Sequence, residues 1–128
     1  MKQYDEWNAL KKLLNNEESK VFFRERDVFW TSIGINVGYE QDGKGDIFSR
    51  PVLVLRKYSK NIFLGIPLST KLKQGSFFFE FSLNEERSNA LLVQARVYDA
   101  KRLENKIGMI GVEEFEQLKL KVRELMNV

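Results

Sequence analysis

Apolar residues recur at helical spacing near both ends of the sequence. One set predicts a helix over residues 3–15 and consists of Tyr4, Trp7, Leu10, Leu13 and Leu14. A second set predicts a C-terminal helix and consists of Val112, Phe115, Leu118, Val122 and Leu125. The pattern therefore predicts two amphipathic helices that flank the rest of the chain.

The segments between these helices are rich in β-branched and aromatic residues, as strands are. They span residues 26–33, 51–55, 62–68, 76–81 and 89–98. The second and third segments are apolar almost without interruption, which predicts strands buried on both faces. Residues 34–49 contain Gly34, Gly38, Gly43 and Gly45 without periodicity, which predicts a long loop. Short turns elsewhere favour a mainly β (α+β) fold, a small antiparallel barrel packed by helices.

The length and apolar content are those of a globular domain rather than a membrane protein. A chain of 128 residues suits one compact domain with its own core. No apolar tract reaches the roughly 18 residues that cross a bilayer, and residues 1–16 lack the apolar run of a signal peptide. The sequence also contains no cysteine. We therefore expect a cytoplasmic protein that does not contact membranes.

Two missing residue types limit the chemistry that this chain can perform. Without cysteine there are no disulfides, thiolate nucleophiles or Cys-ligated zinc. Without histidine the chain lacks the side chain that most often transfers protons near neutral pH. An enzyme of this composition must rely on Arg, Lys, carboxylate or hydroxyl groups, and we expect neither a metal nor a cofactor.

Basic residues are concentrated in one quarter of the sequence. The formal net charge is +3, whereas residues 42–73 hold seven basic and two acidic side chains, a net of +5. Clustered basic charge of this kind is a feature of nucleic-acid-binding proteins, although surface lysines also serve solubility.

One apparent nucleotide motif fails on inspection. Residues 38–44 match the first seven positions of a phosphate-binding loop, but Gly45 stands where Ser or Thr must hold magnesium. The next residues lead into a strand, whereas that mechanism needs a helix N-terminus at the phosphates. An ATPase is therefore not expected.

Four landmarks occur in an order typical of a known family. They are Gly34-Ile-Asn-Val-Gly38-Tyr-Glu40-Gln41, Arg50-Pro51-Val-Leu-Val-Leu55, Gly65-Ile-Pro67-Leu68-Ser69-Thr70 and Gln94-Ala-Arg96-Val-Tyr-Asp99-Ala-Lys101-Arg102-Leu103. Over residues 26–126 the chain resembles the MazF/PemK family of toxin endoribonucleases.

The resemblance implies a fold, an activity and partners. The fold is an SH3-like antiparallel β-barrel over residues 21–128 with a C-terminal helix. Residues 1–20 are expected from the apolar spacing alone to form an extra N-terminal helical extension. The activity is metal-independent, sequence-selective cleavage of single-stranded RNA by the ribose 2′-hydroxyl, which leaves a 2′,3′-cyclic phosphate and a 5′-hydroxyl. The partners are a second copy in a homodimer and a cognate antitoxin, with DNA binding as the toxin–antitoxin complex.

The resemblance also implies roles for individual residues. Arg50 matches the family's catalytic arginine, and Ser69 matches its catalytic hydroxyl, a role that Thr70 can share. A guanidinium is suited to the phosphate dianion because it stays charged and offers paired donors. The expected RNA-binding residues are Glu40, Gln41, Lys44, Lys71, Lys73, Gln94 and Arg96, with Glu40 also a possible partner of Arg50.

Two departures from the family pattern leave alternatives open. The loop between Gln41 and Arg50 is longer than usual, and Leu91 and Val93 stand where some members carry Arg and Asp. A toxin of the same fold that poisons gyrase, or a catalytically silent RNA-binding module, are the other interpretations. The helix over residues 3–15 lies outside the resemblance; it is expected to cover the barrel, extend the dimer or contact the antitoxin.

Overall fold

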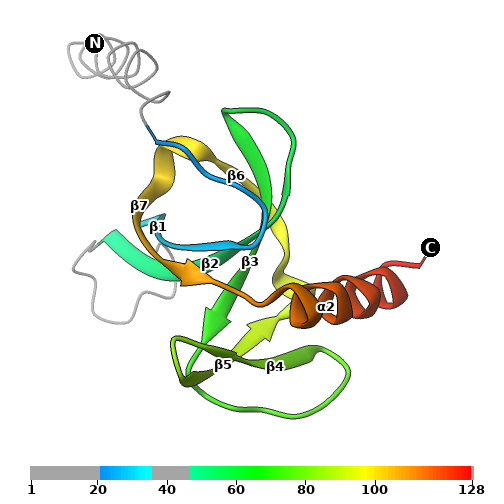
Figure 1. Ribbon diagram of the computed structural model, residues 1–128. Coiled ribbons are helices and arrows are strands. Elements are labelled where there is room, and N and C mark those ends of the chain that lie inside the picture. Colours follow the sequence, from blue (N-terminus) through cyan, green and yellow to red (C-terminus); the bar gives the residue numbers. More distant parts are fainter. Residues whose placement is uncertain (1–20, 36–46, 128) are drawn as a thin grey trace, which may run out of the picture.

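The computed structural model describes residues 21–35 and 47–127 (Figure 1). The helix expected over residues 3–15 lies outside these ranges, and the division at residue 20 therefore stays a prediction. The described elements are β1 (Asp27–Ile35), β2 (Ile47–Lys57), β3 (Ile62–Ser69), β4 (Phe78–Leu83), β5 (Glu86–Leu91), η2 (Leu92–Gln94), β6 (Arg96–Asp99), η3 (Ala100–Arg102), β7 (Leu103–Met109) and α2 (Val112–Leu125).

The strands form one strongly curved antiparallel sheet. Its order is β4-β5-β3-β2-β1-β7, and β6 also pairs with β3. Strands β1, β2, β3, β6 and β7 wrap around one end of the molecule, while α2 packs beside the β4–β5 hairpin (Figure 1). No pairing among the described residues joins β4 to β7, so the sheet stays open there. The predicted fold class, mainly antiparallel β with a C-terminal helix, is confirmed.

Strands β2 and β3 separate two apolar clusters, which explains their uninterrupted apolar sequences. On one face Val52 and Val54 pack with Phe63 and Tyr98, and we call this group the tyrosine-side cluster. On the other face Leu53, Leu55, Ile66 and Leu68 pack with Phe115, Leu118 and Val122 of α2, which we call the helix-side cluster. Because successive side chains of a strand alternate between faces, both faces of these strands are buried. The prediction of two doubly buried strands is confirmed.

The single strand predicted over residues 89–98 is wrong. The chain forms β5 and β6 instead, separated by the 3-10 turn η2. Leu68 pairs with Ala90 in β5, whereas Ile62 pairs with Asp99 in β6. Both β5 and β6 pair with β3, but their registers differ by three residues, and the turn η2 between them accommodates this difference. Periodicity does not detect this break because the residues on both sides of it have similar composition.

Other strand boundaries differ from the prediction, and one strand was missed. β1 extends to Ile35 and β2 begins at Ile47, so the loop expected over residues 34–49 is shorter. The aromatic strand begins at Phe78 rather than Ser76. The missed strand is β7, whose sequence LENKIGM contains too many polar residues to be found by an apolar pattern. Pairing with β1 stabilises it. No described helix is long and apolar enough to cross a membrane.

Candidate functional site

Arg50 and Ser69 lie at matching ends of two neighbouring strands. Val52 of β2 pairs with Pro67 of β3, and Arg50 and Ser69 each lie two residues beyond this pair in the same direction. On its other side Arg50 pairs with Thr31 of β1. Both side chains are half-buried. The strand register therefore carries two residues that are 19 positions apart in sequence to the same end of the β2–β3 ladder.

Alternation along the strands places both residues on one face of the sheet. Arg50 has the same parity as Val52 and Val54 on β2, and Ser69 has the same parity as Phe63 on β3. Val52, Val54 and Phe63 belong to the tyrosine-side cluster. Because side chains two residues apart share a face, Arg50 and Ser69 both lie on the Tyr98 side. The arginine and hydroxyl expected from the sequence thus lie on the same face at the same end of the β2–β3 ladder.

Tyr98 is a buried tyrosine on this face that lies near several arginine side chains. Its side chain is 2% exposed, and its ring stacks on Phe63 with a centroid distance of 5.6 Å. The guanidinium carbon of Arg96 lies 4.8 Å from the centre of the Tyr98 ring, a cation–π contact. Burial raises the pKa of the Tyr98 hydroxyl above 10.0, while the charges of Arg96, Arg50 and Arg102 act in the opposite direction. Three guanidinium groups therefore act on one phenol.

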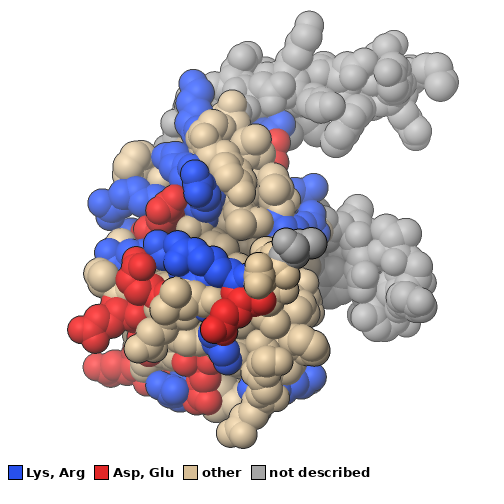
Figure 2. Space-filling view, turned by 90° about the vertical axis from the view of Figure 1, so that its right-hand side faces the viewer, with Lys and Arg blue, Asp and Glu red and all other residues tan. Residues whose placement is uncertain are grey.

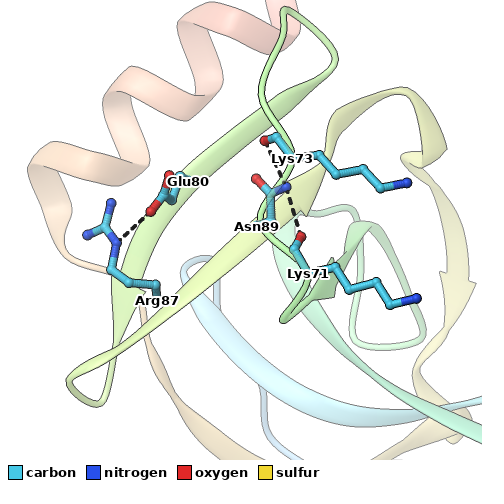
Figure 3. A network of polar contacts seen from close by, with 5 residues as sticks. All are labelled: Lys71, Lys73, Glu80, Arg87 and Asn89. Carbon is cyan, nitrogen blue, oxygen red and sulfur yellow. Dashed lines mark hydrogen bonds and ion pairs between the residues drawn. The ribbon is translucent and has the colours of Figure 1, made fainter.

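Ser69 and the segment after it are fixed by local hydrogen bonds. The Ser69 hydroxyl oxygen accepts a hydrogen bond of 3.0 Å from the Lys71 amide, which bends the chain away from β3. The buried Asn89, which pairs with Ser69 in the sheet, donates to the carbonyls of Lys71 and Lys73 at 3.2 Å each. Both lysine side chains point to the same side, away from the Arg87–Glu80 ion pair (Figure 3). Asn89 thus holds the backbone that presents Lys71 and Lys73.

The remaining predicted RNA-binding residues divide into two groups. Thr70 and Gln94 are exposed, in the segment after β3 and in η2 respectively, and Arg96 is exposed over Tyr98. Glu40, Gln41 and Lys44 lie outside the described residues.

Within residues 21–35 and 47–127 the Arg50 guanidinium has no hydrogen bond or ion pair, so its donors face no described acceptor.

A separate cavity of about 310 Å³ lies on the helix side of the sheet. Its lining consists of Glu25, Leu55, Arg56, Tyr58, Leu64, Lys119, Val122 and Arg123. Figure 2, which views the molecule from the side where α2 ends, shows a band of basic side chains with acidic ones gathered below it. Since Leu55 and Val122 belong to the helix-side cluster, this cavity is distinct from the face that carries Arg50.

The comparison with family models decides the classification of this fold and site. A model described as a PemK-like, MazF-like toxin of a type II toxin-antitoxin system matches residues 24–126. The chain belongs to this family. A search of curated protein sequences found no significant match. As a MazF-like protein, it is the toxin component of a type II toxin–antitoxin system.

Solved structures of similar fold include two that are named MazF. MazF from Deinococcus radiodurans has a TM-score of 0.64 at 16% identity, covering 84% of this chain and 99% of its own. The toxin MazF-mt6 from Mycobacterium tuberculosis has a TM-score of 0.61 at 13% identity, covering 80% and 98%. A mycobacterial endoribonuclease in complex with its cognate antitoxin has a TM-score of 0.63 at 8% identity, covering 84% and 97%. At these identities the likeness establishes the MazF fold of this chain.

Sequence reasoning missed three residues that shape the site of this MazF-like toxin. Tyr98 lies inside the fourth landmark but was passed over between Arg96 and Asp99. Asn89 begins a predicted strand and Gly65 belongs to a landmark, but the sequence predicts no role for either residue in the site. A Cβ at Gly65 would lie 2.6 Å from Val52 and 2.9 Å from both Phe63 and Tyr98, so glycine is required there. Asn89 directly precedes the apolar run 90–93 and follows polar residues, so the sequence contains no signal that it is buried.

Proposed function

We propose that this MazF-like toxin is a metal-independent endoribonuclease that cleaves single-stranded RNA. The observation that carries the proposal is the placement of Arg50 and Ser69 on one face at the same end of β2 and β3. Family membership and the endoribonuclease names of two structural neighbours support it. Cleavage of cellular RNA would account for growth arrest by the toxin.

The proposed reaction needs no nucleophile from the protein, because the RNA supplies it. The ribose 2′-hydroxyl loses its proton and its oxygen forms a bond to the adjacent phosphorus. The bond from phosphorus to the 5′-oxygen of the next nucleotide breaks, and that oxygen gains a proton. The products are a 2′,3′-cyclic phosphate and a free 5′-hydroxyl, so a chain without histidine or cysteine can carry out the reaction.

In this proposal Arg50 stabilises charge and Ser69 orients the phosphate. A guanidinium stays protonated and offers parallel donors to two phosphate oxygens, which gain negative charge in the transition state. The Ser69 hydroxyl donates to the phosphate while its oxygen accepts from the Lys71 amide, and the exposed Thr70 can share this role. A substrate contact by Ser69 would therefore be compatible with its bond to Lys71.

The RNA would continue from this point over neighbouring basic and polar side chains. Lys71 and Lys73 point to one side of the sheet, which suits contacts to successive phosphates (Figure 3). Gln94 and Arg96 belong to the proposed RNA-binding set. The set is completed by Glu40 and Gln41 of the first landmark and by Lys44, three residues further along the chain. We further propose that the toxin acts as a cytoplasmic homodimer and is inhibited by a cognate antitoxin, with which it binds DNA.

Incubation of the purified toxin with single-stranded RNA in excess EDTA tests this function. We expect cleavage to persist in EDTA, because the substrate supplies the nucleophile and Arg50 the positive charge. Fragments should carry a 2′,3′-cyclic phosphate and a 5′-hydroxyl, and sequencing of their ends reports the preferred bases. The same RNA with 2′-O-methyl groups should stay intact because its nucleophile is blocked.

Two outcomes would overturn the nuclease and distinguish the alternatives. Intact RNA together with inhibited gyrase would identify a gyrase poison of the same fold. Intact RNA that is nevertheless bound tightly would identify a catalytically silent RNA-binding module. Free growth during strong expression of the folded toxin would also contradict the proposal.

The contribution of the two lysines can be measured separately from catalysis. With 2′-O-methyl RNA, the logarithm of the binding constant should fall linearly with the logarithm of salt concentration, because phosphate contacts release counterions. Replacing both Lys71 and Lys73 with alanine should reduce this slope by about 1.4, at about 0.7 for each lost contact to a single strand. Lys60→Ala, in the β2–β3 turn, is the control and should leave the slope unchanged. An unchanged slope in the double variant would remove these lysines from the interface.

A further inference from the structure

Three arginines on the tyrosine side form a cluster of positive charge. The charges of Arg96, Arg50 and Arg102 all lower the pKa of Tyr98, so all three lie within electrostatic range of its hydroxyl. None forms an ion pair with a carboxylate anywhere in the described part of the chain. Like charges held together repel one another, and this cost is offset when an anion binds among them. The cluster therefore has the charge of an anion-binding site.

The position of Tyr98 within this cluster is fixed by packing. Its ring stacks on Phe63 at an interplanar angle of 19°. A Cβ on Gly65 would lie 2.9 Å from the Tyr98 ring, which shows that the ring rests directly on the glycine backbone. A side chain confined in this way loses little further freedom when its hydroxyl binds a ligand, which makes it an effective preorganised donor.

Two of the arginines are themselves held in place around the phenol. Arg96 stacks on the Tyr98 ring, and Arg102 donates a hydrogen bond of 3.3 Å to the carbonyl of Ser32 in β1. Arg50 is half-buried at the end of β2 and donates to no described residue. No acceptor within residues 21–35 and 47–127 thus occupies the donors of Arg50, which can bind a ligand beside the phenol.

We propose that Tyr98 is a further catalytic residue of the proposed nuclease, whose hydroxyl donates a hydrogen bond to the phosphate held by Arg50. This inference rests on the proposed function and adds to it a third kind of donor, next to the guanidinium and the Ser69 hydroxyl. Neither the composition nor the family landmarks assign a role to this tyrosine. The step moves no proton to or from the phenol: the hydroxyl donates while both bonds to phosphorus are made and broken.

The electrostatic surroundings suit this role of the phenol. Burial keeps the pKa of Tyr98 above 10.0, so the hydroxyl retains its proton and remains a donor at neutral pH. The neighbouring guanidinium charges lower the pKa of Tyr98, so the pKa is raised less than burial alone would raise it. A hydroxyl that keeps its proton can donate to an oxyanion, and such a charge-assisted hydrogen bond is stronger than one between neutral groups.

Tyr98→Phe is the direct test, because it removes the hydroxyl and keeps the ring. We expect kcat on a defined RNA to fall about tenfold with KM within about twofold, as for a lost hydrogen bond to a charged group in the transition state. The unfolding midpoint should change little, since the stack on Phe63 and the contact with Arg96 are retained. Tyr58→Phe, an exposed tyrosine that lines the cavity on the helix side, is the matched control and should leave kcat unchanged.

A binding measurement separates this proposal from the nuclease itself. Inorganic phosphate is titrated into the ¹⁵N-labelled toxin while the Nε–H signals of Arg50 and Arg96 are followed by NMR. We expect both signals to shift in the wild type, with several-fold weaker affinity in Tyr98→Phe and none of this loss in Tyr58→Phe. If wild-type toxin leaves RNA intact but binds phosphate in this way, the nuclease fails while the Tyr98 site stands. Unchanged kcat and unchanged phosphate affinity in Tyr98→Phe would overturn the assignment of Tyr98.

Discussion

Replacement of Arg50 by lysine is expected to slow RNA cleavage by about 10²–10³-fold, the usual loss for one preorganised contact to an oxyanion. Lysine keeps the positive charge but lacks the planar fork that binds two phosphate oxygens at once. Arg50 is half-buried at the end of β2 and forms no ion pair with a described residue, so the substitution breaks no ion pair within residues 21–35 and 47–127. Single-turnover cleavage rates, with circular dichroism to check folding, measure the effect.

The control for this experiment comes from the same strand. Arg56 is an exposed arginine near the other end of β2 and lines the cavity on the helix side. Arg56→Lys should cleave at nearly the wild-type rate, because Arg56 lies six positions along the strand from Arg50. A rate for Arg50→Lys within a few-fold of wild type would show that charge alone suffices, and would contradict bidentate recognition of the phosphate.

The central part of the fold was predictable from the sequence because its signals are local. The uninterrupted apolar runs of β2 and β3 reflect burial on both faces, and the stripe of α2 reflects its packing on one of them. Arg50 and Ser69, the candidate residues that the family landmarks indicate, directly flank these runs. Each of these conclusions needed only residues close together in the chain.

The remaining features depend on contacts between distant segments. β7 is polar in sequence and is a strand because it pairs with β1, more than 60 positions earlier. The break at η2 follows from the pairing of both β5 and β6 with β3. Tyr98 comes within electrostatic range of Arg50 only through the curvature and register of the sheet. No local pattern contains this information, so the tyrosine was not predicted while the arginine was.

Gly65→Ala tests how the packing of the sheet supports the site, and we expect it to destabilise the toxin by about 1–3 kcal/mol, the usual cost of overpacking a core. The new methyl group would lie 2.6 Å from Cγ1 of Val52 and 2.9 Å from the rings of Phe63 and Tyr98. All three neighbours are buried within the tyrosine-side cluster and cannot move into solvent. Urea unfolding of the variant measures the loss of stability.

A second substitution distinguishes crowding from a general loss of strand stability. Val52→Ala removes the atom closest to the new methyl group, so the double variant Gly65→Ala/Val52→Ala should lose less stability than the sum of the two single variants. Strictly additive losses would contradict crowding at Val52. Since the methyl group also presses on the Tyr98 ring, Gly65→Ala should lower the rate of RNA cleavage even at temperatures where it remains folded. We expect this loss of rate because the position of the Tyr98 ring would connect the packing of β3 to the proposed phosphate site. A folded Gly65→Ala variant with the wild-type rate would contradict this connection.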